Sequence, residues 1–76
     1  MRKLNTKQLE LFNLIRPIFI DHYNNGILPP TFDQLKNKSN FKSFDSTFNA
    51  ILMRGYIDHY PTNDFSNRFI LNSKFN

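Results

Sequence analysis

Residues 31–55 read TFDQLKNKSNFKSFDSTFNAILMRG, and this stretch holds two short helical patterns with a polar turn between them. Thr31 can cap the first helix, because Gln34 stands three residues later as its reciprocal capping-box partner. The residues from 36 to 40 are polar and typical of a turn. We therefore predict a helix over about residues 31–38.

The second pattern starts with Ser43, whose hydroxyl can cap a helix, and stops at Gly55, which favours helix termination. Its apolar residues recur at helical spacing: Phe44, Phe48, Ile51 and Leu52. This spacing predicts a third helix over about residues 43–54, with one buried face and one polar face.

A longer helical pattern precedes this stretch. Asn5 and Gln8 form a second candidate capping box, which predicts a helix over about residues 6–24. Pro17 lacks the N–H that a helix interior needs, so we expect a kink there. The expected core-facing stripe consists of Leu11, Phe12, Leu14, Ile15, Ile18, Phe19 and Tyr23.

After Gly55 the pattern changes from helical to extended. Residues 56–60 and 68–71 are short and rich in β-formers, and residues 61–67 have turn chemistry. We predict a hairpin over about residues 56–71 that must lean on the helices, because a two-stranded hairpin is not stable alone. The tail, residues 72–76, is expected to fray.

Composition narrows the classes of function. The chain has 76 residues, 10 Lys and Arg against 6 Asp and Glu, a net charge of +4 and no cysteine. The excess of cations favours a polyanionic partner, and the lack of thiols excludes disulfides and thiolate zinc sites. The sequence shows neither the apolar stretch of a secretory signal nor a membrane span, so we expect a cytoplasmic protein.

Three helices followed by a two-stranded hairpin form the order of a winged helix-turn-helix, an α+β fold that is mainly α. We expect one such domain over residues 1–76. Several short segments occur in a collinear order: Leu4-Asn5-Thr6-Lys7-Gln8, Phe12-Asn13-Leu14-Ile15-Arg16, Gly26, Pro29-Pro30-Thr31, Phe41-Lys42-Ser43, Arg54-Gly55-Tyr56-Ile57 and Arg68. Through these segments the sequence resembles the DNA-binding domain of LexA-type repressors, from Leu4 to about Leu71.

The resemblance implies a protein that binds duplex DNA with its third helix in the major groove. The first helix is longer and the third is shorter than is usual in that family. The sequence does not hold the family's self-cleaving serine–lysine domain, so cleavage-controlled repression is not implied. We expect a small transcriptional or mobile-element regulator.

The polar face of the predicted third helix carries the candidate base contacts: Ser46, Thr47, Asn49 and Ala50. Short or forked polar side chains reach base edges in the major groove. Asn49 suits adenine N6 and N7, and Ala50 suits a thymine methyl group. The resemblance places Ser43, Asp45, Ser46 and Asn49 in the stretch that contacts the operator. The alternative is a solvated face of an amphipathic helix.

Cations and helix N–H groups beside that helix are candidates for contacts with the DNA backbone. The expected set is Lys36, Lys38, Lys42, Ser43 and Arg68. Lys42 and Ser43 stand at the positive N-terminus of the helix, where an anion is readily bound. The alternative is that these cations keep a small protein soluble.

Neither catalysis nor a cofactor is predicted. The two histidines, His22 and His59, are expected at the surface or at an edge, and no carboxylate and nucleophile stand at the spacing of a catalytic set. No metal-ligand spacing and no glycine-rich phosphate loop occur.

Two other functions fit the same sequence. One is an adapter or inhibitor that docks on a replication or transcription factor, with Met53, Phe65 and Phe75 as anchors. The other is a replication accessory that stacks single-stranded DNA on aromatic rings. For a homodimer, the candidate self-association residues are Leu9 and Ile20, which lie off the apolar stripe, and Phe75 in the tail.

Overall fold

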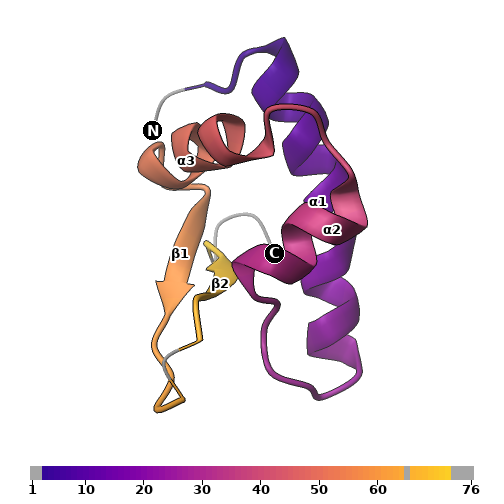
Figure 1. Cartoon of the computed structure of the whole chain (residues 1–76), viewed down its shortest axis with the longest axis vertical. Helices are drawn as coiled ribbons and strands as arrows, with labels where there is room; N and C mark the ends of the chain where they lie inside the picture. Colours follow the sequence, from indigo (N-terminus) through magenta and orange to yellow (C-terminus); the bar gives the residue numbers. More distant parts are fainter. Residues whose placement is uncertain (1–2, 65, 73–76) are drawn as a thin grey trace.

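The computed structural model describes residues 3–64 and 66–72. Three helices, α1 (Thr6–Asn24), α2 (Phe32–Ser39) and α3 (Phe44–Met53), precede two strands, β1 (Ile57–Tyr60) and β2 (Arg68–Leu71) (Figure 1). The strands form an antiparallel pair. This is the predicted winged helix-turn-helix layout, α+β and mainly α.

The predicted bounds of the elements agree closely with the structure. In α1, Asn5 Oδ1 accepts from the N–H of Gln8 at 2.8 Å, and Gln8 Oε1 accepts from the N–H of Asn5 at 3.0 Å. Thr31 and Gln34 form the same reciprocal pair at α2. Both predicted capping boxes are therefore confirmed. The helix α1 continues through Pro17 to Asn24.

The core lies where α1 meets α2, α3 and the hairpin. Phe48 on α3 is at its centre. Its ring is stacked on that of Phe44, with 5.1 Å between the ring centroids, and stands edge-on to that of Phe69 in β2, with 5.0 Å between the centroids. The buried hydrophobic residues are Leu11, Phe12, Ile15, Phe19, Leu35, Phe44, Phe48, Ile51, Ile57, Phe69 and Leu71. Phe48 thus joins the third helix to the hairpin that the helices support.

The buried stripe of α1 is narrower than predicted. Leu14 is 48% exposed and Tyr23 is 85% exposed, so their assignment to the core is wrong. At about 100° per residue, the buried residues of α1 from Leu11 to His22 lie within one arc of the helix, and Leu14 and Tyr23 fall outside that arc on opposite sides.

The strand β2 is held on both of its sides. Along one side it pairs with β1, in a register from Ile57 opposite Leu71 to Tyr60 opposite Arg68. On the other side, the N–H of Phe69 donates to the carbonyl of Pro30 at 3.1 Å. The segment before α2 therefore acts as a short third partner of the hairpin.

Candidate nucleic-acid interface

The turn between α2 and α3 is set by two residues in the left-handed region, Asn40 with φ 48° and Ser43 with φ 62°. Asn40 ends α2, and its N–H donates to the carbonyl of Lys36 at 3.1 Å. Ser43 occupies the predicted cap position of α3, but within the described residues its side chain makes no capping hydrogen bond. The predicted hydroxyl cap is therefore wrong, because the left-handed backbone of Ser43 differs from the extended one of an ordinary cap.

Four residues form what we call the outer face of α3: Ser46, Asn49, Ala50 and Met53. Their spacing places them on one side of the helix. Ser46 and Asn49 are exposed, Ala50 is half-buried and Met53 is 79% exposed. Three of the four predicted base-contact residues therefore lie on a face that is open to a ligand.

Thr47 does not belong to this face. It is only 7% exposed and shares the buried side of α3 with Phe44 and Ile51, which lie three residues before it and four after it. The prediction that Thr47 contacts a base is wrong, because its side chain is part of the packing that holds α3 on the core.

Lys36 lies beside the N-terminal part of α3. Its Nζ is 3.0 Å from Oδ1 of Asp45, and the two side chains are 48% and 68% exposed. The pair links α2 to α3 and offsets the acidic charge next to the outer face. Lys42 is exposed just before α3 begins.

Lys38 is separated from that position. Residues two apart on a helix point about 200° apart, so Lys38 faces away from the side of α2 on which Lys36 meets Asp45. The structure thus brings Lys36 and Lys42 to α3, and it places Lys38 on another side of α2.

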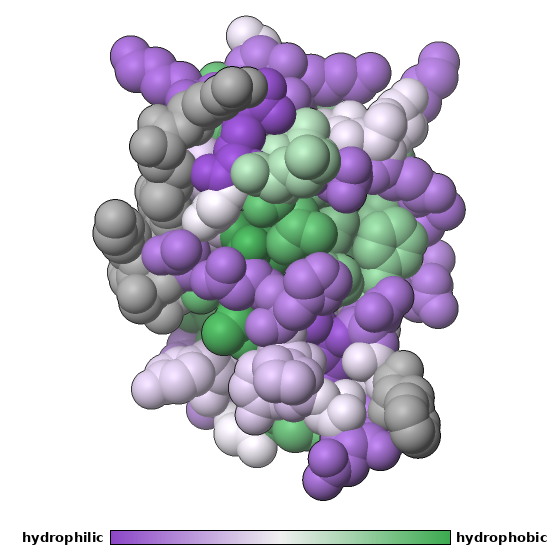
Figure 2. Space-filling model, turned by 90° about the vertical axis from the view of Figure 1, so that its left-hand side faces the viewer, coloured by the Kyte–Doolittle hydropathy of each residue, from purple (hydrophilic) through white to green (hydrophobic). Residues whose placement is uncertain are grey.

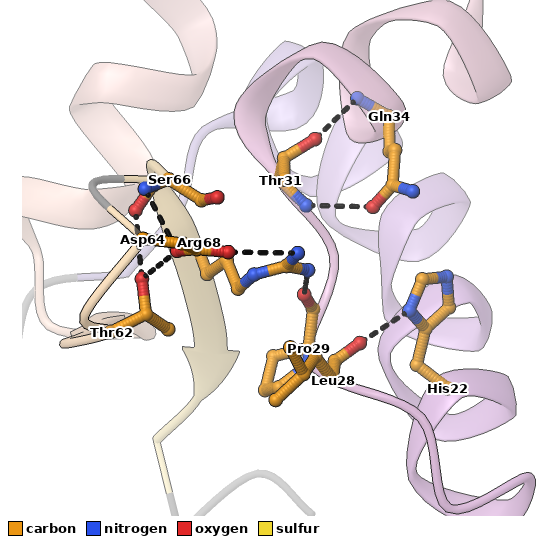
Figure 3. A network of polar contacts seen from close by, with 9 residues as sticks. All are labelled: His22, Leu28, Pro29, Thr31, Gln34, Thr62, Asp64, Ser66 and Arg68. Atoms are coloured by element: carbon orange, nitrogen blue, oxygen red, sulfur yellow. Dashed lines mark hydrogen bonds and ion pairs between the residues drawn. The ribbon is translucent and has the colours of Figure 1, made fainter.

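Arg68 is bound within the protein. Its guanidinium donates to the carbonyl of Pro29 at 2.7 Å and lies 3.8 Å from Oδ2 of Asp64, and its side chain is only 16% exposed (Figure 3). The predicted phosphate contact of Arg68 stays a prediction, and these partners leave less of the guanidinium available for it. Arg68 fastens the hairpin to the segment that precedes α2.

Asp64 organises the loop of the hairpin before Arg68. Its Oδ1 accepts from the Thr62 hydroxyl at 2.6 Å and from the N–H of Ser66 at 3.1 Å (Figure 3). These hydrogen bonds, the one from Thr62 foremost, lower the pKa of Asp64 from 3.8 to about 2. The ionised carboxylate is therefore the form that the folded loop favours.

This pKa shift predicts a pH dependence of stability. Because the folded-state pKa of Asp64 lies below the unfolded one, its stabilising contribution is complete above about pH 4 and is lost as the pH falls toward 2. Thermal unfolding followed by circular dichroism should show a smaller drop in Tm between these pH values for Asp64→Asn than for the wild type. Asp58→Asn removes one negative charge from the same hairpin and is the control. An equally steep drop in Asp64→Asn would contradict this assignment.

His22 is buried, in contrast to the predicted surface or edge position. It is 4% exposed, and its Nδ1 lies 3.0 Å from the carbonyl oxygen of Leu28 (Figure 3). Helical spacing from Ile15 and Phe19 contained this signal, because His22 follows them by seven and three residues.

Within the described residues no group of His, Asp and Glu has the arrangement of a metal site.

An apolar hollow of about 900 Å³ lies at the other end of the domain from α3. The end of α1, the segment that follows it and the hairpin line it, with Phe19, Ile20, Tyr23, Leu28, Tyr60 and Ile70 among the residues. Sequence reasoning singled out Ile20 as an exposed apolar residue but did not predict the hollow, because its walls are far apart in the sequence. A molecule in this hollow would leave the outer face of α3 open.

The molecular surface on the side where α3 ends and β1 begins has both hydrophobic and hydrophilic areas (Figure 2). Figure 2 shows a hydrophobic area there, surrounded by hydrophilic residues. Of the three predicted partner anchors, Met53 is exposed, whereas Phe65 and Phe75 lie outside the described residues.

Comparison of the chain with protein-family models, with curated proteins and with solved structures gives no match. In residues 3–64 and 66–72, none of the helices combines the length and the apolar character that crossing a bilayer requires.

Proposed function

We propose that this protein binds duplex DNA with α3 in the major groove, as a small transcriptional or mobile-element regulator. The observation that carries the proposal is the outer face of α3, which stands open beside Lys36 and Lys42. The resemblance to LexA-type DNA-binding domains supports the same use of the third helix.

The dimensions of α3 suit this role. An α-helix with its side chains is about 10–12 Å wide, and the major groove of B-DNA is about 12 Å wide. The 10 residues of α3 span about 15 Å, enough to cover a few base pairs. Lys42 and the first N–H groups of α3 then meet a phosphate, which fixes the position of the helix along the duplex.

Duplex DNA is favoured over single strands by the location of the aromatic rings. Stacking of unpaired bases needs exposed rings, but five phenylalanines belong to the buried core. Phe32, Phe41 and Tyr56 are partly buried against it. Among the described phenylalanines and tyrosines only Tyr23 is largely exposed, and it lies on α1, away from the outer face of α3.

A salt titration tests the proposal. Fluorescence anisotropy with a labelled duplex of about 20 bp should show log K falling linearly with log salt, and Lys42→Ala should reduce the slope by about 0.9. A single strand of the same sequence should bind more weakly. If neither nucleic acid binds at about 50 mM salt while the folded chain holds a protein partner, the adapter function replaces this proposal.

A further inference from the structure

The outer face of α3 lacks the groups that usually read guanine. Guanine O6 and N7 are most often bound by arginine or lysine, and α3 has no cation between Phe44 and Met53. Arg54 follows directly, but it is partly buried, and its Nη1 donates to the carbonyl of Ala50 at 3.3 Å. What α3 offers a base is an amide, a hydroxyl and apolar atoms.

The amide of Asn49 contacts its neighbour on the next turn of the same face. Its Nδ2 donates to Sδ of Met53 at 3.6 Å, a weak contact between two exposed side chains. A side-chain amide has two N–H donors and one carbonyl acceptor. With one donor turned toward Met53, the other donor and Oδ1 remain for adenine N7 and the N6 amino group.

Met53 is the most exposed apolar side chain of α3, at 79%. Ala50 lies three residues before it on the same face. In the major groove the C5-methyl group of thymine is the apolar feature that a base pair presents. An exposed methionine beside an adenine-reading amide therefore matches a thymine next to that adenine.

We propose that α3 reads A·T base pairs, with Asn49 on adenine and with Ala50 and Met53 on thymine methyl groups. This inference rests on the proposed duplex binding and names its preferred ligand, an A·T-rich major groove. It assigns Met53 to the DNA rather than to a protein partner.

Methyl deletion in the DNA tests this reading. A site is first selected from a random duplex library, and its thymines are then replaced by deoxyuridine, which lacks the C5-methyl group. Each methyl contact that is lost should weaken wild-type binding about fourfold. In Met53→Ala the same replacement should have a smaller effect, because the methyl group has already lost its partner. Leu14→Ala, an exposed apolar truncation on α1, should keep the full sensitivity to deoxyuridine.

The outcomes separate this inference from the proposed function. A selected site rich in A·T pairs, with a deoxyuridine effect that depends on Met53, supports both. Salt-dependent duplex binding to a G·C-rich site, or equal affinity for thymine and deoxyuridine duplexes, overturns the base assignment and leaves duplex binding intact. Absence of duplex binding overturns both.

Discussion

Replacement of Phe48 by alanine should lower the free energy of unfolding by about 3–5 kcal/mol. The side chain is almost fully buried, and its ring packs against the rings of Phe44, Phe69 and Phe32. The centroids of the Phe48 and Phe32 rings are 5.5 Å apart. Truncation removes these contacts and leaves a cavity between α3 and the hairpin. A domain of this size has roughly 4–11 kcal/mol of stability, so the substitution removes between about a quarter and all of it. Urea unfolding followed by circular dichroism measures the loss.

The matched control for this variant is Leu14→Ala. Leu14 is 48% exposed, and surface truncations usually change stability by no more than about 0.5 kcal/mol. Phe48→Leu retains part of the apolar volume and should fall between the two. A loss below about 1 kcal/mol in Phe48→Ala would mean that the aromatic cluster does not hold α3 in place.

Replacement of both Lys36 and Lys42 by alanine should weaken duplex binding about 60-fold at 0.1 M salt, if each lysine neutralises one phosphate. The slope of log K against log salt should fall by about 1.8. The variant also leaves Asp45 without its ion-pair partner beside the outer face of α3, which adds repulsion of DNA. Anisotropy titrations at several salt concentrations measure both quantities.

Replacement of both Lys7 and Arg16 by alanine gives the control. It also removes two positive charges, but from exposed positions on α1. It should lose much less affinity than the Lys36 and Lys42 pair. Lys38→Ala is a second control on α2 itself, since Lys38 faces away from α3. Equal losses in both double variants would show that DNA responds to net charge alone and that no surface of the protein is preferred.

Local signals in the sequence were sufficient for the elements of the fold. The capping boxes at Asn5 and Thr31 depend on residues three apart, and both occur in the structure as predicted. Gly55, with φ 85°, follows the end of α3 as expected of a terminating glycine. These features are confirmed because a helix end is decided within one turn of chain.

The candidate site was predictable only in part. Arg68 donates to the carbonyl of Pro29, 39 residues earlier in the chain. No sequence pattern around either residue predicts this hydrogen bond. Thr47 is a different case, because its spacing from Phe44 and Ile51 already placed it on the buried side of α3. A hydroxyl group indicates a possible contact only where helical spacing also puts it on the exposed face.

The attachment of β2 to the segment before α2 bears on how the hairpin meets a ligand. Two main-chain hydrogen bonds, from Phe69 to Pro30 and from Phe32 to Asn67, fix the base of the hairpin against the helices. The hairpin base is thus already ordered before binding. Association with a rigid partner therefore costs little conformational entropy in this part of the chain. The heat-capacity change of complex formation would then arise mainly from the surface that the two molecules cover.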